Sequence, residues 1–119
     1  MEGTNGDCLP AWLDVRESRV GHRLVLAATG EVDIASAGIL REALAAAVAS
    51  GAAEVWLDLT SVEFMDSTGI SAIVDARSHL DSRLAVICPD GQVRRVLAIS
   101  GVDRSIAIHP NRFAAHAAR

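Results

Sequence analysis

Lysine and tyrosine are both missing from this 119-residue sequence, and aromatic residues make up only 3% of it. The absence of lysine excludes a Walker A nucleotide-binding loop and a pyridoxal Schiff base, because each needs a lysine side chain. Half of the residues are hydrophobic, so a core must be built mainly from valine, leucine, isoleucine and alanine. The length allows one such core, and therefore one domain.

Long apolar runs and an excess of positive charge are missing as well. The longest apolar run, Ala43–Ala49, falls well short of the roughly 20 residues that a membrane-spanning helix needs. The N-terminus, M-E-G-T-N-G-D, is acidic and polar, unlike a signal peptide. The formal net charge of −4 argues against direct nucleic-acid binding, which usually relies on a basic patch. We therefore expect a cytoplasmic protein that contacts neither a membrane nor nucleic acid.

Cysteine and histidine are too few and too scattered to indicate a metal or cofactor site. Cys8 lies in the polar N-terminal stretch, where we expect an exposed free thiol, and Cys88 ends an apolar run, where we expect burial. The four histidines show no metal-ligand spacing with each other or with the cysteines. We expect neither a metal nor a cofactor.

Hydrophobic periodicity divides the chain into a flexible lead-in over residues 1–11 and one α/β domain over residues 12–119. A loosely alternating stretch and an apolar run, separated by Val20-Gly21, predict a strand pair at one edge of a sheet. Strands that alternate with helices after this pair imply a mostly parallel sheet of about five strands, packed by three to four helices. The expected strands cover residues 12–19, 22–29, 54–59, 83–88 and 105–109; the expected helices cover 35–50, about 70–80, about 91–100 and, less regularly, 111–119.

Particular residues are expected to begin or end these elements. Residues 30–33, G-E-V-D, should break the second strand. Asp33 or Ser36 can cap the first helix, Gly51 can end it, and Asp90 can cap the third helix. The apolar stripe of the second helix should comprise Ile70, Ile73, Val74 and Leu80.

Residues 66–69, D-S-T-G, place an acid, two hydroxyls and a glycine between the third strand and the second helix. The carboxyl end of a strand is where α/β sheets tend to carry their sites. In the simplest interpretation, Asp66 or Ser67 caps the helix, which is worth about 1 kcal/mol, and Gly69 permits a tight turn. A phosphorylated Ser67 is the alternative, since free N–H groups and the helix dipole favour a phosphate there. These four residues alone leave both interpretations open.

Known catalytic chemistries do not fit this cluster. An aspartic protease needs D-T-G or D-S-G, and here Thr68 interrupts that pattern. A serine nucleophile needs a general base, and no histidine is placed for it. A phospho-acceptor aspartate of the response-regulator kind needs a lysine late in the chain. We therefore expect a protein that is not an enzyme.

Three stretches of the sequence resemble the STAS domain of bacterial anti-sigma factor antagonists. They are G-E-V-D (Gly30–Asp33), V-W-L-D-L-T-S-V-E-F-M-D-S-T-G-I (Val55–Ile70) and V-R-R-V-L-A-I-S-G-V-D-R (Val93–Arg104), and the resemblance covers roughly residues 12–113. The resemblance implies a protein that is monomeric when free and binds an anti-sigma factor, a GHKL-type serine kinase. Such binding releases a sigma factor for transcription.

The same resemblance implies which residues carry this switch. The kinase would phosphorylate Ser67, with Thr68 as the competing acceptor, and so break the complex, which a PP2C-type phosphatase would restore. The implied partner-binding residues are Glu31, Asp33, Met65, Asp66, Thr68, Gly69 and Ser71. Ser71 departs from the family pattern, which often has a second glycine there, and partner choice could be altered by it. The rival interpretation is a STAS scaffold or regulatory subunit of a transport or other multiprotein complex, without phosphorylation.

Overall fold

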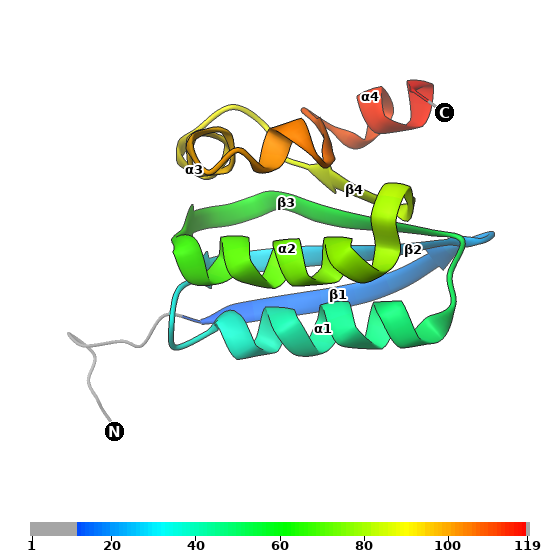
Figure 1. Cartoon of the computed structure of the whole chain (residues 1–119), viewed down its shortest axis with the longest axis horizontal. Coiled ribbons are helices and arrows are strands. Elements are labelled where there is room, and N and C mark those ends of the chain that lie inside the picture. The colour runs from blue at the N-terminus through cyan, green and yellow to red at the C-terminus, as the bar shows by residue number, and fades with distance from the viewer. Residues whose placement is uncertain (1–11, 119) are drawn as a thin grey trace.

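A five-stranded sheet with four helices forms the body of the protein in the computed structural model, which describes residues 12–118 (Figure 1). The predicted flexible lead-in over residues 1–11, including Cys8, lies outside the described residues. The strands are β1 (Leu13–Val20), β2 (Arg23–Val32), β3 (Glu54–Met65), β4 (Leu84–Ile87) and β5 (Ala107–His109). The helices are α1 (Ala37–Ser50), α2 (Ser67–Leu80), α3 (Gln92–Ile99) and α4 (Arg112–Ala117), with short 3-10 turns η2 (Asp81–Arg83) and η3 (Val102–Arg104).

The sheet has the spatial order β1-β2-β3-β4-β5, with β1 antiparallel to β2 and every other pair parallel. This arrangement confirms the predicted α/β class, the strand pair at one edge and the mostly parallel sheet. Because β2, β3 and β4 are parallel, their carboxyl ends point to the same end of the molecule, where α1, α2 and α3 begin (Figure 1).

Helices α1 and α2 lie side by side on one face of the sheet (Figure 1). Leu40 and Leu44 of α1 recur at a four-residue spacing and are buried, as the helical pattern predicts. Ile73 and Leu80 of α2 are also buried in this core, together with Leu57 of β3. Aliphatic side chains therefore fill the main core, as expected from the scarcity of aromatic residues.

The opposite face of the sheet carries a smaller core beneath α4. Val25, Trp56, Ala85, Ile87 and Ala115 make up this cluster. Trp56 is buried there, and the guanidinium of Arg23 lies 3.8 Å from the centre of its ring. Arg112 donates to the carboxylate of Asp58 at 2.7 Å and ties α4 to β3.

Two strands are longer than the sequence predicts. Strand β2 continues to Val32 and β3 continues to Met65, where Val32 and Met65 are paired. The prediction that residues 30–33 break the second strand is therefore wrong for the first three of them. Parallel pairing with β3 supplies the backbone hydrogen bonds, and two register shifts absorb the irregularity, one of them between Gly30 and Glu31.

Two details of the helices also differ from expectation. Gly91, and not Asp90, occupies the N-cap position of α3, and glycine has no side chain that could cap the helix. Val74 is 47% exposed, because α2 turns Ala72, Ile73 and Ala76 toward the core instead. Gly51 ends α1 in the left-handed conformation, as predicted.

Candidate functional site

Asp66 joins the end of β3 to the start of α2. Its backbone is extended, its N–H donates to the carbonyl of Val32 at 3.1 Å, and its Oδ1 accepts from the N–H of Thr68 at 2.9 Å. Asp66 is thus the N-cap of α2, one of the two caps that the sequence predicts. The bond to Val32 fixes the cap against the neighbouring strand β2.

The two hydroxyls that follow Asp66 are in different situations. The hydroxyl of Thr68 donates to Oδ1 of Asp66, and Thr68 is partly buried. Ser67 is exposed, and its hydroxyl makes no hydrogen bond to any residue between 12 and 118. Of the two predicted acceptors, Ser67 is therefore the more accessible one.

Gly69 and Met65 lie beneath this surface. Gly69 is buried, and a Cβ added to it would come within 2.7 Å of Cγ of Met65 and 2.8 Å of Cγ1 of Val32. The glycine is therefore needed for the close approach of α2 to the strand ends, since its backbone does not adopt a positive φ. Met65 is fully buried. Both residues can shape the predicted partner-binding site from below.

A side-chain amide holds β3 in place just before the cap. Gln92, at the start of α3, accepts from the N–H of Met65 and donates to its carbonyl, both at 3.3 Å. This paired contact resembles the bonding of a further strand and keeps the last residue of β3 ordered. Sequence reasoning did not single out Gln92, whose signal was only its position near a helix start.

The loop between β2 and α1 lies next to Asp66 and is internally hydrogen-bonded. Oδ1 of Asp33 accepts from the N–H groups of Ala35 at 2.9 Å and Ser36 at 3.2 Å. The hydroxyl of Ser36 donates to the carbonyl of Glu31 at 2.7 Å and accepts from the N–H of Asp33 at 3.0 Å. Ser36 is the N-cap residue by position, but its side chain makes no bond to the helix, so Asp33 organises this turn.

A shallow hollow lies beside Ser67, between the starts of α1 and α2. It is lined by Ile34, Ala37, Gly38, Arg41, Ser67, Thr68 and Ser71. Arg41 is its only charged lining residue within the described part of the chain. The structure thus brings three predicted site residues, Ser67, Thr68 and Ser71, to one concave surface and adds Arg41 and Ile34, which the sequence analysis missed.

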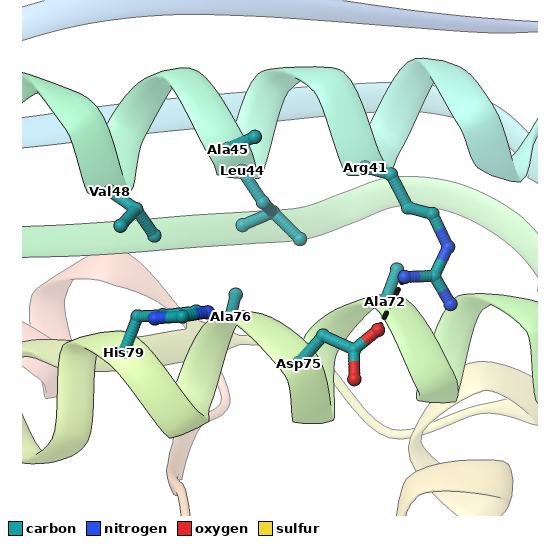
Figure 2. A pocket seen from close by; sticks show the side chains of 8 residues that line it. All are labelled: Arg41, Leu44, Ala45, Val48, Ala72, Asp75, Ala76 and His79. Carbon is teal, nitrogen blue, oxygen red and sulfur yellow. Dashed lines mark hydrogen bonds and ion pairs between the residues drawn. The ribbon is translucent and has the colours of Figure 1, made fainter.

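Arg41 crosses from α1 to α2. Its Nη2 donates to the hydroxyl of Ser71 at 3.0 Å. Its Nη1 pairs with Asp75 at 2.5 Å, as Figure 2 shows. A glycine at position 71 would offer no hydroxyl for this contact. A second hollow, of about 290 Å³, lies between the two helices, and Arg41 and Asp75 are among the residues that line it. Figure 2 shows these lining side chains.

Exposed apolar side chains occur at the same end of the sheet. Ile34 is 84% exposed, and Trp12 and Phe64 are also exposed. Trp12 accepts a hydrogen bond from the N–H of Glu31 through its carbonyl, and Glu31 is paired with Phe64 across β2 and β3. A large apolar side chain, Ile34, between Asp33 and Ser36 in a short loop was the available sequence signal for this surface. Exposed apolar residues grouped near a polar centre are typical of protein-binding surfaces.

Among residues 12–118, the site has neither a grouped set of metal-ligating side chains nor an exposed thiol. Within residues 12–118, no three His, Cys, Asp or Glu side chains are grouped so that they could hold a metal ion. Cys88 is buried, as predicted, and burial raises the pKa of its thiol to about 11, although Arg94 opposes this change. Among these same residues, no helix has the length and apolar character to cross a membrane.

Comparison with known proteins places these features in a family. The sequence pattern of the STAS domain matches residues 15–115, which is most of the chain. The chain belongs to the STAS domain family. This membership confirms the resemblance carried by the G-E-V-D and D-S-T-G stretches.

Several relatives of this STAS protein are named anti-sigma factor antagonists. The anti-sigma-F factor antagonist RsfB of Mycobacterium tuberculosis is 27% identical over 86 residues, which cover 71% of this chain and 70% of RsfB. An anti-sigma factor antagonist from Mycobacterium paratuberculosis has a TM-score of 0.82 at 24% identity, covering 88% of this chain and 92% of that one. Unphosphorylated SpoIIAA, also an anti-sigma factor antagonist, has a TM-score of 0.71 at 22% identity, covering 89% and 96%. The structural likenesses establish the shared fold.

Proposed function

We propose that this STAS protein is an anti-sigma factor antagonist that is switched off by phosphorylation of Ser67. Its partner would be an anti-sigma factor that is also a GHKL-type serine kinase, and a PP2C-type phosphatase would reverse the modification. The observation that carries the proposal is the exposed hydroxyl of Ser67 at the start of α2, which makes no hydrogen bond within residues 12–118. The antagonist names of the relatives support the choice of partner.

The hydrogen bonds favour Ser67 over Thr68 as the acceptor. A kinase must bring the acceptor oxygen in line with the γ-phosphorus of ATP and remove its proton. The Ser67 hydroxyl is available for this, whereas the Thr68 hydroxyl already donates to Asp66 and would first have to leave that bond. Phosphorylation of Thr68 would also place the phosphate next to the Asp66 carboxylate, where the two negative charges would repel each other.

A phosphate on Ser67 should block docking without unfolding the protein. The fold accommodates it, because Ser67 is exposed and the N-terminal end of a helix dipole favours negative charge. A partner covering the same surface would have to bury about two negative charges beside Asp66. If this costs about 3–4 kcal/mol, as for a broken buried ion pair, the affinity falls several-hundred-fold.

The partner-facing surface would combine this polar centre with the apolar residues around it. Glu31, Asp33 and Asp66 would supply its charge, and Ser71 would contribute from the next turn of α2. Ile34 and Phe64 would supply exposed apolar area. The proposed protein acts in the cytoplasm, is a monomer when free, and performs no chemistry of its own.

A pull-down from native lysate tests this function. The baits are the wild type, Ser67→Ala, Ser67→Glu and Ser78→Glu. Ser78 is exposed on the same helix, three turns from Ser67, so its substitution controls for added charge on α2. We expect a GHKL-type kinase to bind the wild type, Ser67→Ala and Ser78→Glu, and to be lost only with Ser67→Glu.

Two results would count against the proposal. Recovery of the kinase by all four baits would show that a negative charge at position 67 does not prevent binding, and that Ser67 is not the switch. Recovery of the same transporter or scaffold proteins by all four would favour the rival role as a scaffold or regulatory subunit. In that case, the hydroxyl of Ser67 would have no regulatory function.

A further inference from the structure

We propose that Arg41 of α1 is the phosphate-binding residue of this switch: it leaves Asp75 and binds the phosphate when Ser67 is phosphorylated. This inference rests on the proposed modification of Ser67 and adds a residue that binds the resulting phosphate. The observations are the position of Arg41 in the hollow beside Ser67 and the bonds that its guanidinium makes now.

The guanidinium is within reach of a phosphate on Ser67. Ser67 and Ser71 are one helical turn apart, which places their Cβ atoms about 5–6 Å from each other on one side of α2. Nη2 of Arg41 is already 3.0 Å from the hydroxyl of Ser71. A phosphate on Ser67 extends into the hollow that Arg41 lines, so a rotation of the arginine side chain is sufficient to bring the two groups together.

The start of α2 does not satisfy the phosphate by itself. Of its first four N–H groups, those of Thr68, Gly69 and Ile70 already donate to Asp66, the first to the side chain and the other two to the carbonyl. The Asp66 carboxylate also repels a second anion. A cation beside the phosphate would offset this repulsion, and Arg41 is the charged residue that lines this hollow among residues 12–118.

The present partners of Arg41 can be given up easily. The side chains of Arg41 and Asp75 are 44% and 64% exposed, and exposed ion pairs contribute little to stability. A phosphate offers a planar guanidinium two charge-assisted hydrogen bonds at once, which a single carboxylate oxygen and a hydroxyl do not match. The exchange of partners is therefore favourable.

The exchange of partners by Arg41 also changes the surface charge at Asp75, away from Ser67. Once Arg41 binds the phosphate, Asp75 loses its counter-charge at the mouth of the hollow between α1 and α2 (Figure 2). A partner that covers both helices would thus meet a changed charge two turns beyond Ser67, in addition to the phosphate itself.

The test installs phosphoserine at position 67 during translation by genetic code expansion, and uses phosphorus NMR to titrate its second ionisation. The variants are the otherwise wild-type protein, Arg41→Gln, Arg41→Lys and Arg16→Gln. Arg16 is an exposed arginine that pairs with Asp14 on β1, so its loss controls for a general change in charge. Circular dichroism checks that each variant is folded.

We expect the phosphoserine pKa to be about 0.5–1 unit higher in Arg41→Gln than in the wild type, a three- to tenfold change in its dissociation constant. Arg41→Lys should lie in between, because it keeps the charge and loses the paired bonds, and Arg16→Gln should match the wild type. Equal values for the wild type, Arg41→Gln and Arg41→Lys would overturn the inference. Because the phosphoserine is encoded, this result is independent of whether a kinase modifies Ser67 and of the partner binding that the pull-down measures.

Discussion

Replacing Gly69 by alanine puts a methyl group into the contact between α2 and the ends of β2 and β3. Its Cβ would lie 2.7 Å from Cγ of Met65 and 2.8 Å from Cγ1 of Val32, both shorter than real carbon–carbon contacts. Neither neighbour can move into solvent, since both are fully buried, and the branched Val32 has few rotamers to choose from. The start of α2 must therefore shift outward.

The balance of two effects gives the expected magnitude. Alanine is about 1 kcal/mol better than glycine inside a helix, and somewhat less so in the first turn. Overpacking a well-filled core costs about 1–3 kcal/mol, and the two short contacts made by Gly69→Ala place it in the upper part of that range. We expect a net loss of about 1–2 kcal/mol in the free energy of unfolding.

Gly38→Ala is the matched control, because Gly38 lies in the first turn of α1 with nothing within 4 Å of an added Cβ. Denaturant unfolding of both variants should show Gly38→Ala equal to the wild type or more stable by up to about 1 kcal/mol, and Gly69→Ala less stable. If Gly69→Ala were as stable as Gly38→Ala, the close packing beneath Ser67 would be refuted.

Three further outcomes are expected. Burial would raise the pKa of Asp58, but hydrogen bonds from Thr60 and from Arg112 lower this pKa overall. The charged carboxylate of Asp58 therefore stabilises the fold at pH values above about 4, the pKa of an aspartate in the unfolded chain. Asp58→Asn should therefore cost about 1–2 kcal/mol at pH 7, and in paired denaturation curves this difference should shrink below pH 4; a constant difference would contradict it. Cys88, with a pKa of about 11, should resist iodoacetamide at pH 7.5 until denaturant is added, as followed by mass spectrometry of its peptide, and rapid labelling of the native protein would contradict the burial. Gly30→Ala should lower the thermal midpoint, because Gly30 has φ +125° and an added Cβ would clash with the Trp12 carbonyl oxygen; an unchanged midpoint would contradict that close approach.

The order of strands and helices could be predicted from the sequence, because hydrophobic periodicity and composition depend only on residues close together in the chain. The spacing of Leu40 and Leu44 predicts a helix whatever lies around it, and the apolar run before Asp58 predicts a buried strand. The ends of β2 and β3 did not follow, because their last residues pair with each other across a gap of some 33 residues in the chain. Long-range backbone pairing of this kind leaves no mark in a short sequence window.

The candidate site was predictable in its chemistry and not in its geometry. The D-S-T-G stretch placed an acid and two hydroxyls at the end of a strand, and Asp66 is a cap as expected. The difference between Ser67 and Thr68 depends on one hydroxyl rotamer, which the sequence does not encode in a readable way. Arg41 was missed because it lies outward on α1, and only the packing of α1 against α2 brings it to Ser71.

The affinity of the purified kinase partner for this protein with and without phosphoserine at position 67 tests the central claim most directly. Isothermal titration calorimetry or fluorescence anisotropy measures both dissociation constants under the same conditions. The proposed switch predicts binding weaker by several-hundred-fold with the phosphate, from the cost of about 3–4 kcal/mol of burying it beside Asp66. Equal affinities for the two forms would contradict the claim that phosphorylation of Ser67 controls this protein.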